Sequence, residues 1–247
     1  MIFIIGSGRS GTHFLTRILC DYQKFNDQNG GQEFHDILEW TTVDAINHEP
    51  LREAVFEHYD KCLERAEKKG EIFIDQCQTN LFHVDQLRKK YPKAIFAMPL
   101  RSNEQIISSY QRKVGAFRHW NEAARNGKTK KGVGVRPVWP NQFLGLQTPE
   151  QLKGNESDLM IQRCSANKIK QQMVMHDHSD VLYTFKYDDL VHDTSIVTSL
   201  PFDMELKNPK KRVRPRMDTI TKYLAMPEDY REKIKTNAYE LQELVHG

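Results

Sequence analysis

The stretch Met1-Ile2-Phe3-Ile4-Ile5-Gly6-Ser7-Gly8-Arg9-Ser10-Gly11-Thr12-His13 decides the fold of this chain. Five apolar residues lead into a glycine-rich segment, and apolar residues with helical spacing follow from Thr12 to Tyr22. A short apolar run is typical of a strand that is buried on both faces. A glycine-rich loop between a strand and a helix can aim backbone N–H groups at an anion over the helix N-terminus. The stretch therefore predicts a strand, a phosphate-binding loop and a helix.

The loop differs from the nucleotide-binding P-loop at the positions that handle metal and charge. The P-loop pattern G-x-x-x-x-G-K-[ST] places Lys after the last glycine and then a hydroxyl that binds magnesium. Counted from Gly6, these two positions hold Thr12 and His13, and a cation lies inside the loop as Arg9. We therefore expect the loop to bind phosphate, but it is poorly suited to a metal-bridged triphosphate.

A second anion-binding motif follows an apolar strand expected at residues 93–100. Arg101 stands at the C-terminal end of this strand, and Ser109 follows eight residues later on the next expected helix. This spacing allows a guanidinium at a strand end and a hydroxyl two turns into a helix to converge on one phosphate.

Together the two motifs resemble the sulfotransferases that use phosphoadenosine phosphosulfate (PAPS). The loop R-S-G-T is similar to the family's phosphosulfate loop P-[KR]-S-G-T-[TS], with Gly8 in place of Pro and His13 in place of the last hydroxyl. The resemblance implies that Arg101 and Ser109 hold the 3′-phosphate of PAPS and that no metal is needed. It also implies that Arg9 neutralises charge on the bridging oxygen, and that the phosphosulfate is bound by Gly8, Arg9, Ser10, Gly11, Thr12 and His13.

The candidate catalytic base lies shortly after the first helix. The segment Gln32–Asp36 resembles the place where the carbohydrate and tyrosylprotein sulfotransferases keep a catalytic glutamate, which is Glu33 here. Sulfonyl transfer to a hydroxyl needs a base within hydrogen-bond reach of the acceptor proton, and a carboxylate or an imidazole could serve. His35 is therefore the second choice, and an ordinary exposed loop carboxylate is the alternative for Glu33. The family often carries a Lys near the end of the second strand, where this chain has Gln76.

Two basic segments have less specific interpretations. Residues 120–158 are rich in Gly, Pro and basic residues, and they are expected to be either a lid over the acceptor pocket or a disordered loop. A basic lid would suit an anionic acceptor. A later basic run holds Lys207, Lys210, Lys211, Arg212, Arg214 and Arg216. The family often closes the cofactor site with such a segment, which would add Lys211 and Arg212 to the site. The run lacks the family's R-K-G pattern, so a nucleic-acid-binding or solvated patch stays open.

Four expected strands alternate with expected helices. Three are at residues 1–5, 71–75 and 93–100, and the fourth lies in residues 181–190 and runs into a helix cap. This order predicts an α/β fold in three layers, with a central parallel sheet flanked by helices as in P-loop NTPases and sulfotransferases. The last strand runs into Lys186-Tyr187-Asp188-Asp189-Leu190, which is similar to the family's [RK]-Y-E-D-L and is interpreted as a fold signature. We expect a single domain over residues 1–247, with the lid as an insertion.

Composition limits the classes of function. The chain has 38% hydrophobic residues and a net charge of +3, which suits an anionic cofactor without requiring nucleic acid. No apolar run approaches the roughly 20 residues that span a bilayer, so a soluble cytoplasmic protein without a membrane partner is expected. The four cysteines, Cys20, Cys62, Cys77 and Cys164, are far apart and are expected to be reduced.

The sequence thus predicts a PAPS-dependent, metal-independent sulfotransferase that acts on a hydroxyl of a saccharide, a peptide or a small molecule. A P-loop kinase is one alternative, but it requires a magnesium ligand and a Lys that Thr12 and His13 do not provide. A nucleic-acid-binding module is the other alternative. It would explain the late basic run, but it assigns no role to Arg101 and Ser109.

Overall fold

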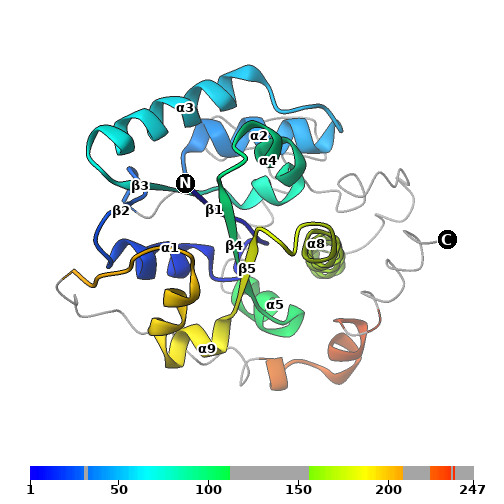
Figure 1. Ribbon diagram of the computed structural model, residues 1–247. Helices are drawn as coiled ribbons and strands as arrows, with labels where there is room; N and C mark the ends of the chain where they lie inside the picture. The colour runs from blue at the N-terminus through cyan, green and yellow to red at the C-terminus, as the bar shows by residue number, and fades with distance from the viewer. Residues whose placement is uncertain (31–32, 112–155, 208–222, 235, 237–247) are drawn as a thin grey trace.

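The computed structural model of the chain describes residues 1–30, 33–111, 156–207, 223–234 and 236. Strands and helices alternate in these ranges (Figure 1). The strands are β1 (Ile2–Ile4), β2 (Phe25–Asn26), β3 (Ile72–Gln76), β4 (Ile95–Leu100) and β5 (Leu182–Lys186). The α-helices are α1 (Thr12–Cys20), α2 (His35–Ile46), α3 (Glu53–Lys68), α4 (Val84–Lys90), α5 (Asn103–Gln111), α8 (Glu156–Asp177) and α9 (Tyr187–His192). Two 3-10 helices join them, η1 (Gln78–Phe82) and η3 (Thr194–Ser199).

The strands form one parallel sheet in the order β2-β3-β1-β4-β5. Strand β1 lies in the middle, where Ile2 pairs with Ile74 of β3 on one side and with Ile95 of β4 on the other. The C-terminal ends of parallel strands meet at one edge of the sheet, which is where ligands bind in folds of this kind. This sheet confirms the α/β fold predicted from the sequence. Strand β2 was not predicted, because an edge strand of two residues is too short to show any periodicity.

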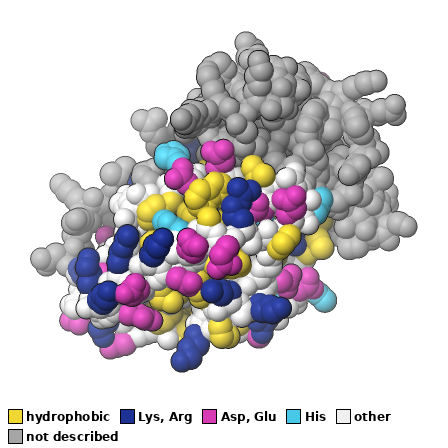
Figure 2. Space-filling model, turned by 90° about the horizontal axis from the view of Figure 1, so that it is seen from above, with side chains coloured by type: hydrophobic (Ala, Val, Ile, Leu, Met, Phe, Trp, Pro, Cys, Tyr) yellow, Lys and Arg dark blue, Asp and Glu magenta, His cyan; other side chains and the backbone are white. Residues whose placement is uncertain are grey.

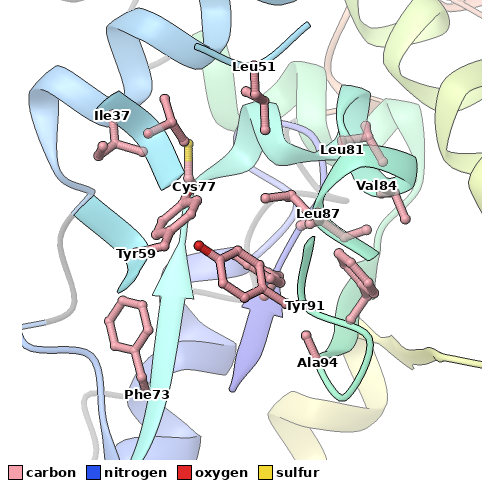
Figure 3. Packing of buried hydrophobic residues seen from close by; sticks show 14 of the residues in the cluster. Ile37, Leu51, Tyr59, Phe73, Cys77, Leu81, Val84, Leu87, Tyr91 and Ala94 are labelled. Atoms are coloured by element: carbon pink, nitrogen blue, oxygen red, sulfur yellow. The ribbon is translucent and has the colours of Figure 1, made fainter. Parts of the chain in front are cut away.

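Helices cover both faces of the sheet and make three layers (Figure 1). Side chains alternate along β1, so Phe3 and Ile5 join the hydrophobic cluster under α2, α3 and α4. Ile2 and Ile4 join the cluster on the opposite face, with residues of α1 and α9. Figure 3 shows the first cluster, in which side chains of α2, α3, η1 and α4 converge beside β3. The first strand is therefore buried on both faces, as its apolar run predicts.

A third hydrophobic cluster fixes α5 beside the sheet. Ile106, Ile107 and Tyr110 of α5 pack with Cys164 of α8 and with residues of the 223–234 segment. Helix α8 contacts both α5 and η1. This packing determines where α5 presents Ser109.

Figure 2 shows the face of the molecule seen from above in the orientation of Figure 1, where α2 and α3 lie. Acidic and basic side chains are interspersed among the described residues of this face. Along α3, Lys68 pairs with Glu64 one turn away at 2.6 Å, which is typical of a solvated helix surface. None of the helices in the described ranges combines the length and apolarity needed to cross a membrane.

Candidate active site

The loop between β1 and α1 is a tight turn held by its own hydrogen bonds. The backbone N–H and the Oγ of Ser10 both donate to the carbonyl of Ser7, at 3.2 Å and 2.7 Å. The backbone φ is positive at Gly6 (148°), Arg9 (69°) and Gly11 (113°). Gly11 is the N-cap of α1, so the loop leads directly into the first turn of the helix, where backbone N–H groups lack helical partners. This geometry is suited to holding an anion.

Side chains from three other elements close on the glycines of this loop. A Cβ at Gly8 would collide with the hydroxyl of Tyr110 and would lie 2.7 Å from Gln78 Oε1. A Cβ at Gly11 would lie 2.6 Å from the ring of Tyr187. Only glycine fits these two positions without movement of α5, η1 or α9.

Gly8→Ala is therefore expected to push Tyr110 and Gln78 away and to distort the loop. We expect the melting temperature to fall by about 2–10 °C. We also expect the affinity for 3′-phosphoadenosine 5′-phosphate (PAP), the product of the PAPS-dependent transfer that the sequence predicts, to fall about 10- to 100-fold. Gly70→Ala is the matched control, because Gly70 has a φ of 65° and open space around it. The control should lower the melting temperature without changing the PAP affinity measured by calorimetry. If Gly8→Ala and Gly70→Ala bind PAP equally well, the prediction is contradicted.

Two arginines and a serine come together on the β4 side of the loop. Arg101, the first residue after β4, donates from Nη1 to the carbonyl of Arg9 at 3.0 Å. Arg9 in turn donates from Nε to Ser109 Oγ at 3.1 Å. The guanidinium of Arg101 also lies over the ring of Tyr187, 4.2 Å from its centroid. The structure thus brings Arg9, Arg101 and Ser109 into one cluster. Its two arginine side chains can donate charge-assisted hydrogen bonds to an anion.

A pocket of about 680 Å³ opens beside this cluster, within the size range of small-molecule sites. It is lined by Leu100, Arg101, Ser102, Glu104, Gln105, Lys168, Lys186, Tyr187, Asp188 and Tyr223. Sequence reasoning missed Tyr187 as a site residue, because its stretch was interpreted as a fold signature. Its position between Arg101 and Gly11 depends on how α9 packs on the loop, which no local pattern encodes.

Glu33 lies on the opposite side of the loop, at the end of β3. Gln76 Nε2 donates to Glu33 Oε1 at 3.4 Å and to Thr12 Oγ1 at 3.3 Å. The backbone N–H of Gln78 also points to Glu33 Oε1, at a long 3.5 Å. Gln76 thus links the candidate base Glu33 to the loop between β1 and α1.

His35 takes a different place from Glu33. It is the first residue of α2, is exposed, and lines a separate pocket of about 310 Å³ between α2 and α3. The other residues around this pocket are Phe34, Asp36, Ile37, Trp40, Ala54, Glu57, His58 and Lys61. Of the two candidate bases, it is Glu33 that the described hydrogen bonds connect to the loop.

Some predicted features lie outside the described residues. These are Lys211 and Arg212 in the late basic run, and the expected lid up to residue 155. The last three residues of that expected lid, 156–158, form the start of α8. His13 is half-buried in the first turn of α1.

A buried polar network lies under the end of β3. Asp75 Oδ2 accepts hydrogen bonds from the hydroxyl of Tyr59 at 3.2 Å and from Asn80 Nδ2 at 2.8 Å. Burial raises the pKa of Asp75 to about 7, the hydrogen bonds from Tyr59 and Asn80 oppose this shift, and the nearby charge of Glu33 adds to it. The network fixes the chain on both sides of Gln76. The Asp that directly follows the apolar run Ile72–Ile74 was the sequence signal that could have revealed it.

This network predicts a pH dependence of stability. The folded pKa of Asp75 lies above its ordinary value near 3.9, so the stabilising contribution is complete below about pH 4 and is lost as pH rises through about 7. Asp75→Asn removes this titration. Relative to wild type, the variant should gain up to about 4 kcal/mol of unfolding free energy between pH 4 and 8, because each tenfold change in proton affinity corresponds to about 1.4 kcal/mol. Urea unfolding at both pH values measures the difference, with the exposed Asp36→Asn as control. A difference that does not change with pH would show that Asp75 does not titrate in this range.

An anionic nucleotide cofactor fits the described residues. Arg9 and Arg101 supply positive charge beside the loop, and the Ser7 hydroxyl is buried without a hydrogen-bond partner in the described part of the chain. Within the same ranges, no group of three or more His, Cys, Asp or Glu side chains could hold a metal ion. The loop and the arginine cluster are therefore the groups available to hold phosphate and sulfate oxygens.

Comparison with known proteins agrees with this geometry. No curated protein sequence matches the chain. A solved structure, the sulfotransferase domain from the curacin biosynthetic pathway, matches over 98% of this chain and 97% of that domain, with a TM-score of 0.52 and 13% identity. At that identity the match shows the fold alone. The model of the sulfotransferase family matches residues 2–131, which is more than half of the 247 residues. The chain belongs to the sulfotransferase family.

Proposed function

We propose that this protein transfers a sulfonyl group from PAPS to a hydroxyl acceptor without the help of a metal ion. The observation that carries the proposal is the arrangement around the loop, with Arg9, Arg101 and Ser109 joined on one side and Glu33 held on the other through Gln76. One side is suited to anion binding and the other to proton transfer, and both meet the loop.

The cofactor would be held by the loop and by the arginine cluster. In this proposal, the backbone N–H groups of residues 8–13 and the hydroxyl of Thr12 bind the phosphosulfate, and Ser10 keeps the loop closed through its bonds to Ser7. Arg101 and Ser109 bind the 3′-phosphate. The pocket next to Arg101 and Tyr187 receives the nucleotide. PAPS, when bound, supplies the activated sulfonyl group.

Transfer itself would use two side chains of this chain. As the oxygen of the acceptor hydroxyl attacks the sulfonyl group, Glu33 accepts the proton of that hydroxyl, which is the role of a general base. Arg9, anchored by Ser109, stabilises the negative charge that develops on the leaving phosphate oxygen. The negative charge of Glu33 and the positive charge of Arg9 both come from side chains, so the proposed transfer needs no metal ion.

The acceptor would approach from the Glu33 side. We propose a saccharide, peptide or small-molecule hydroxyl, and the 310 Å³ pocket that begins at Phe34 and His35 is available to part of it. Aromatic and charged side chains both line this pocket, and such a mixture suits ligands that carry apolar and polar groups.

A calorimetric titration with PAP, run in parallel with adenosine 5′-phosphosulfate and with magnesium–ATP, tests the proposal. We expect PAP to bind at least tenfold more tightly than adenosine 5′-phosphosulfate, because Arg101 and Ser109 would contact the 3′-phosphate. Transfer from radiolabelled PAPS to a panel of saccharides, tyrosyl peptides and phenols then identifies the acceptor. Tight binding of magnesium–ATP with no preference for a 3′-phosphate would overturn the proposal in favour of a kinase.

A further inference from the structure

The face of helix α8 that packs toward the interior of the protein includes a stripe of residues, and some of them are polar. Its buried residues include Cys164, Asn167, Gln171 and Val174, which are spaced three or four apart along one face. The face of a helix that packs inward is ordinarily apolar, so the amides at positions 167 and 171 require an explanation. The proposed sulfonyl transfer assigns them no role.

Gln171 is the most unusual member of the stripe. Its side chain is only 1% exposed, and neither Nε2 nor Oε1 has a hydrogen-bond partner among the described residues. Taking an amide out of water without replacing its hydrogen bonds is destabilising, and nearly all buried side-chain amides in proteins are paired. In this structure, Gln171 therefore lowers the stability of the folded protein.

The unpaired amide lies against the start of the phosphate-binding loop. Gln171 Nε2 is 3.6 Å from the position that a Cβ would occupy on Gly6. The next residue, Ser7, is 3% exposed, and its hydroxyl also has no hydrogen-bond partner among the described residues. A hydroxyl can both donate and accept, so it complements either end of the Gln171 amide. Two buried groups without partners among the described residues therefore lie next to Gly6.

We propose that Gln171 is a positioning residue whose amide pairs with the Gly6–Ser7 part of the loop when the phosphosulfate is bound. This inference rests on the proposed function. A bound anion draws the backbone N–H groups of the loop toward its oxygens, and Gly6 is the position where the backbone can rotate most freely. That rotation brings the Ser7 segment to the Gln171 amide. Cofactor binding thereby satisfies groups that are buried without partners.

The proposal predicts opposite effects on stability and on binding. Gln171→Met keeps the length of the side chain and removes its donors and acceptors. Without nucleotide, the melting temperature should rise by about 2–6 °C, because the unpaired amide is gone. PAP affinity in calorimetry should fall about 3- to 10-fold, because the loop loses its partner. A residue that only packs α8 against the sheet would not move the two quantities in opposite directions.

Two further variants sharpen the test. Gln172→Met makes the same chemical change one residue away on an exposed position and should alter neither quantity. Ser7→Ala should weaken PAP binding in the same way as Gln171→Met. In the double variant the two losses of affinity should not add, because both substitutions remove the same interaction.

The outcomes separate this inference from the proposed function. If wild type fails to bind PAP, the proposed function is wrong. If wild type binds PAP and Gln171→Met binds it equally well, only the role of Gln171 is overturned. A lower melting temperature with unchanged affinity would assign Gln171 to packing. Should Gln171→Met not fold, Ser7→Ala decides, since unchanged PAP affinity in that variant also contradicts the pairing.

Discussion

Glu33→Gln is expected to lower kcat for sulfonyl transfer about 10²- to 10⁴-fold, which is the usual contribution of a general base. The substitution keeps a carbonyl oxygen that can accept from Gln76 and Gln78, so the local structure should persist. PAP affinity should therefore stay within about twofold, because Glu33 belongs to the proton-transfer side of the site. Single-turnover transfer from radiolabelled PAPS, together with PAP calorimetry, measures both quantities.

His35→Gln is the matched control for this experiment. His35 is exposed, and the described hydrogen bonds do not connect it to the loop, so its loss should leave kcat nearly unchanged even if it raises the KM for an acceptor that enters the pocket between α2 and α3. If the results are reversed, with full activity in Glu33→Gln and a large loss in His35→Gln, the imidazole is the base. A loss of PAP affinity in Glu33→Gln equal to its loss of kcat would instead show that Glu33 supports the loop.

Arg101→Ala is expected to weaken PAP binding about 10- to 100-fold, the range for the loss of charge-assisted hydrogen bonds to a phosphate. Binding of adenosine 5′-phosphosulfate, which lacks the 3′-phosphate, should change much less. Arg101→Lys keeps the charge but loses the planar group that reaches the Arg9 carbonyl and stacks on Tyr187, so it should recover only part of the affinity. Calorimetry with both nucleotides measures these differences.

The surface residue Arg88 provides the control for Arg101. It pairs with Asp180 on the outside of the molecule, so Arg88→Ala should leave the affinity for both nucleotides unchanged. If Arg101→Ala weakens PAP and adenosine 5′-phosphosulfate equally, Arg101 acts by holding the loop rather than by contacting the 3′-phosphate.

The parts of the site that could be predicted from the sequence are those set by local chain geometry. A buried strand followed by a glycine-rich turn specifies the loop, and the strand end specifies Arg101, with Ser109 two turns along the next helix. Hydrogen bonds between these segments bring Arg9, Arg101 and Ser109 together. Their proximity follows from the parallel order of β1 and β4, which the alternation of strands and helices predicts.

The parts that sequence reasoning missed depend on tertiary packing. Tyr187, Gln78 and Gln171 reach the loop only because α9, η1 and α8 pack against it, and no periodicity in the sequence specifies those contacts. Which of Glu33 and His35 lies beside the loop also could not be predicted, because it depends on α2 beginning at residue 35.

One departure from the family pattern has a physical reason in the packing around the loop. Gly8 stands where related loops carry Pro, and the space that a side chain would need is occupied by Tyr110 and Gln78. A proline ring at position 8 would collide with Gln78 of η1 and Tyr110 of α5, whereas glycine fits.

The central place of β1 in the sheet makes the site a single cooperative unit. Its neighbours β3 and β4 carry Gln76 and lead into Arg101, so both halves of the site depend on strands that pair with β1. Amide hydrogens of such inner strands exchange with solvent mainly when the whole domain unfolds. A partly opened molecule that keeps only one half of the site is therefore not expected, and slow exchange along β1 would report on the integrity of the loop and of both its flanks.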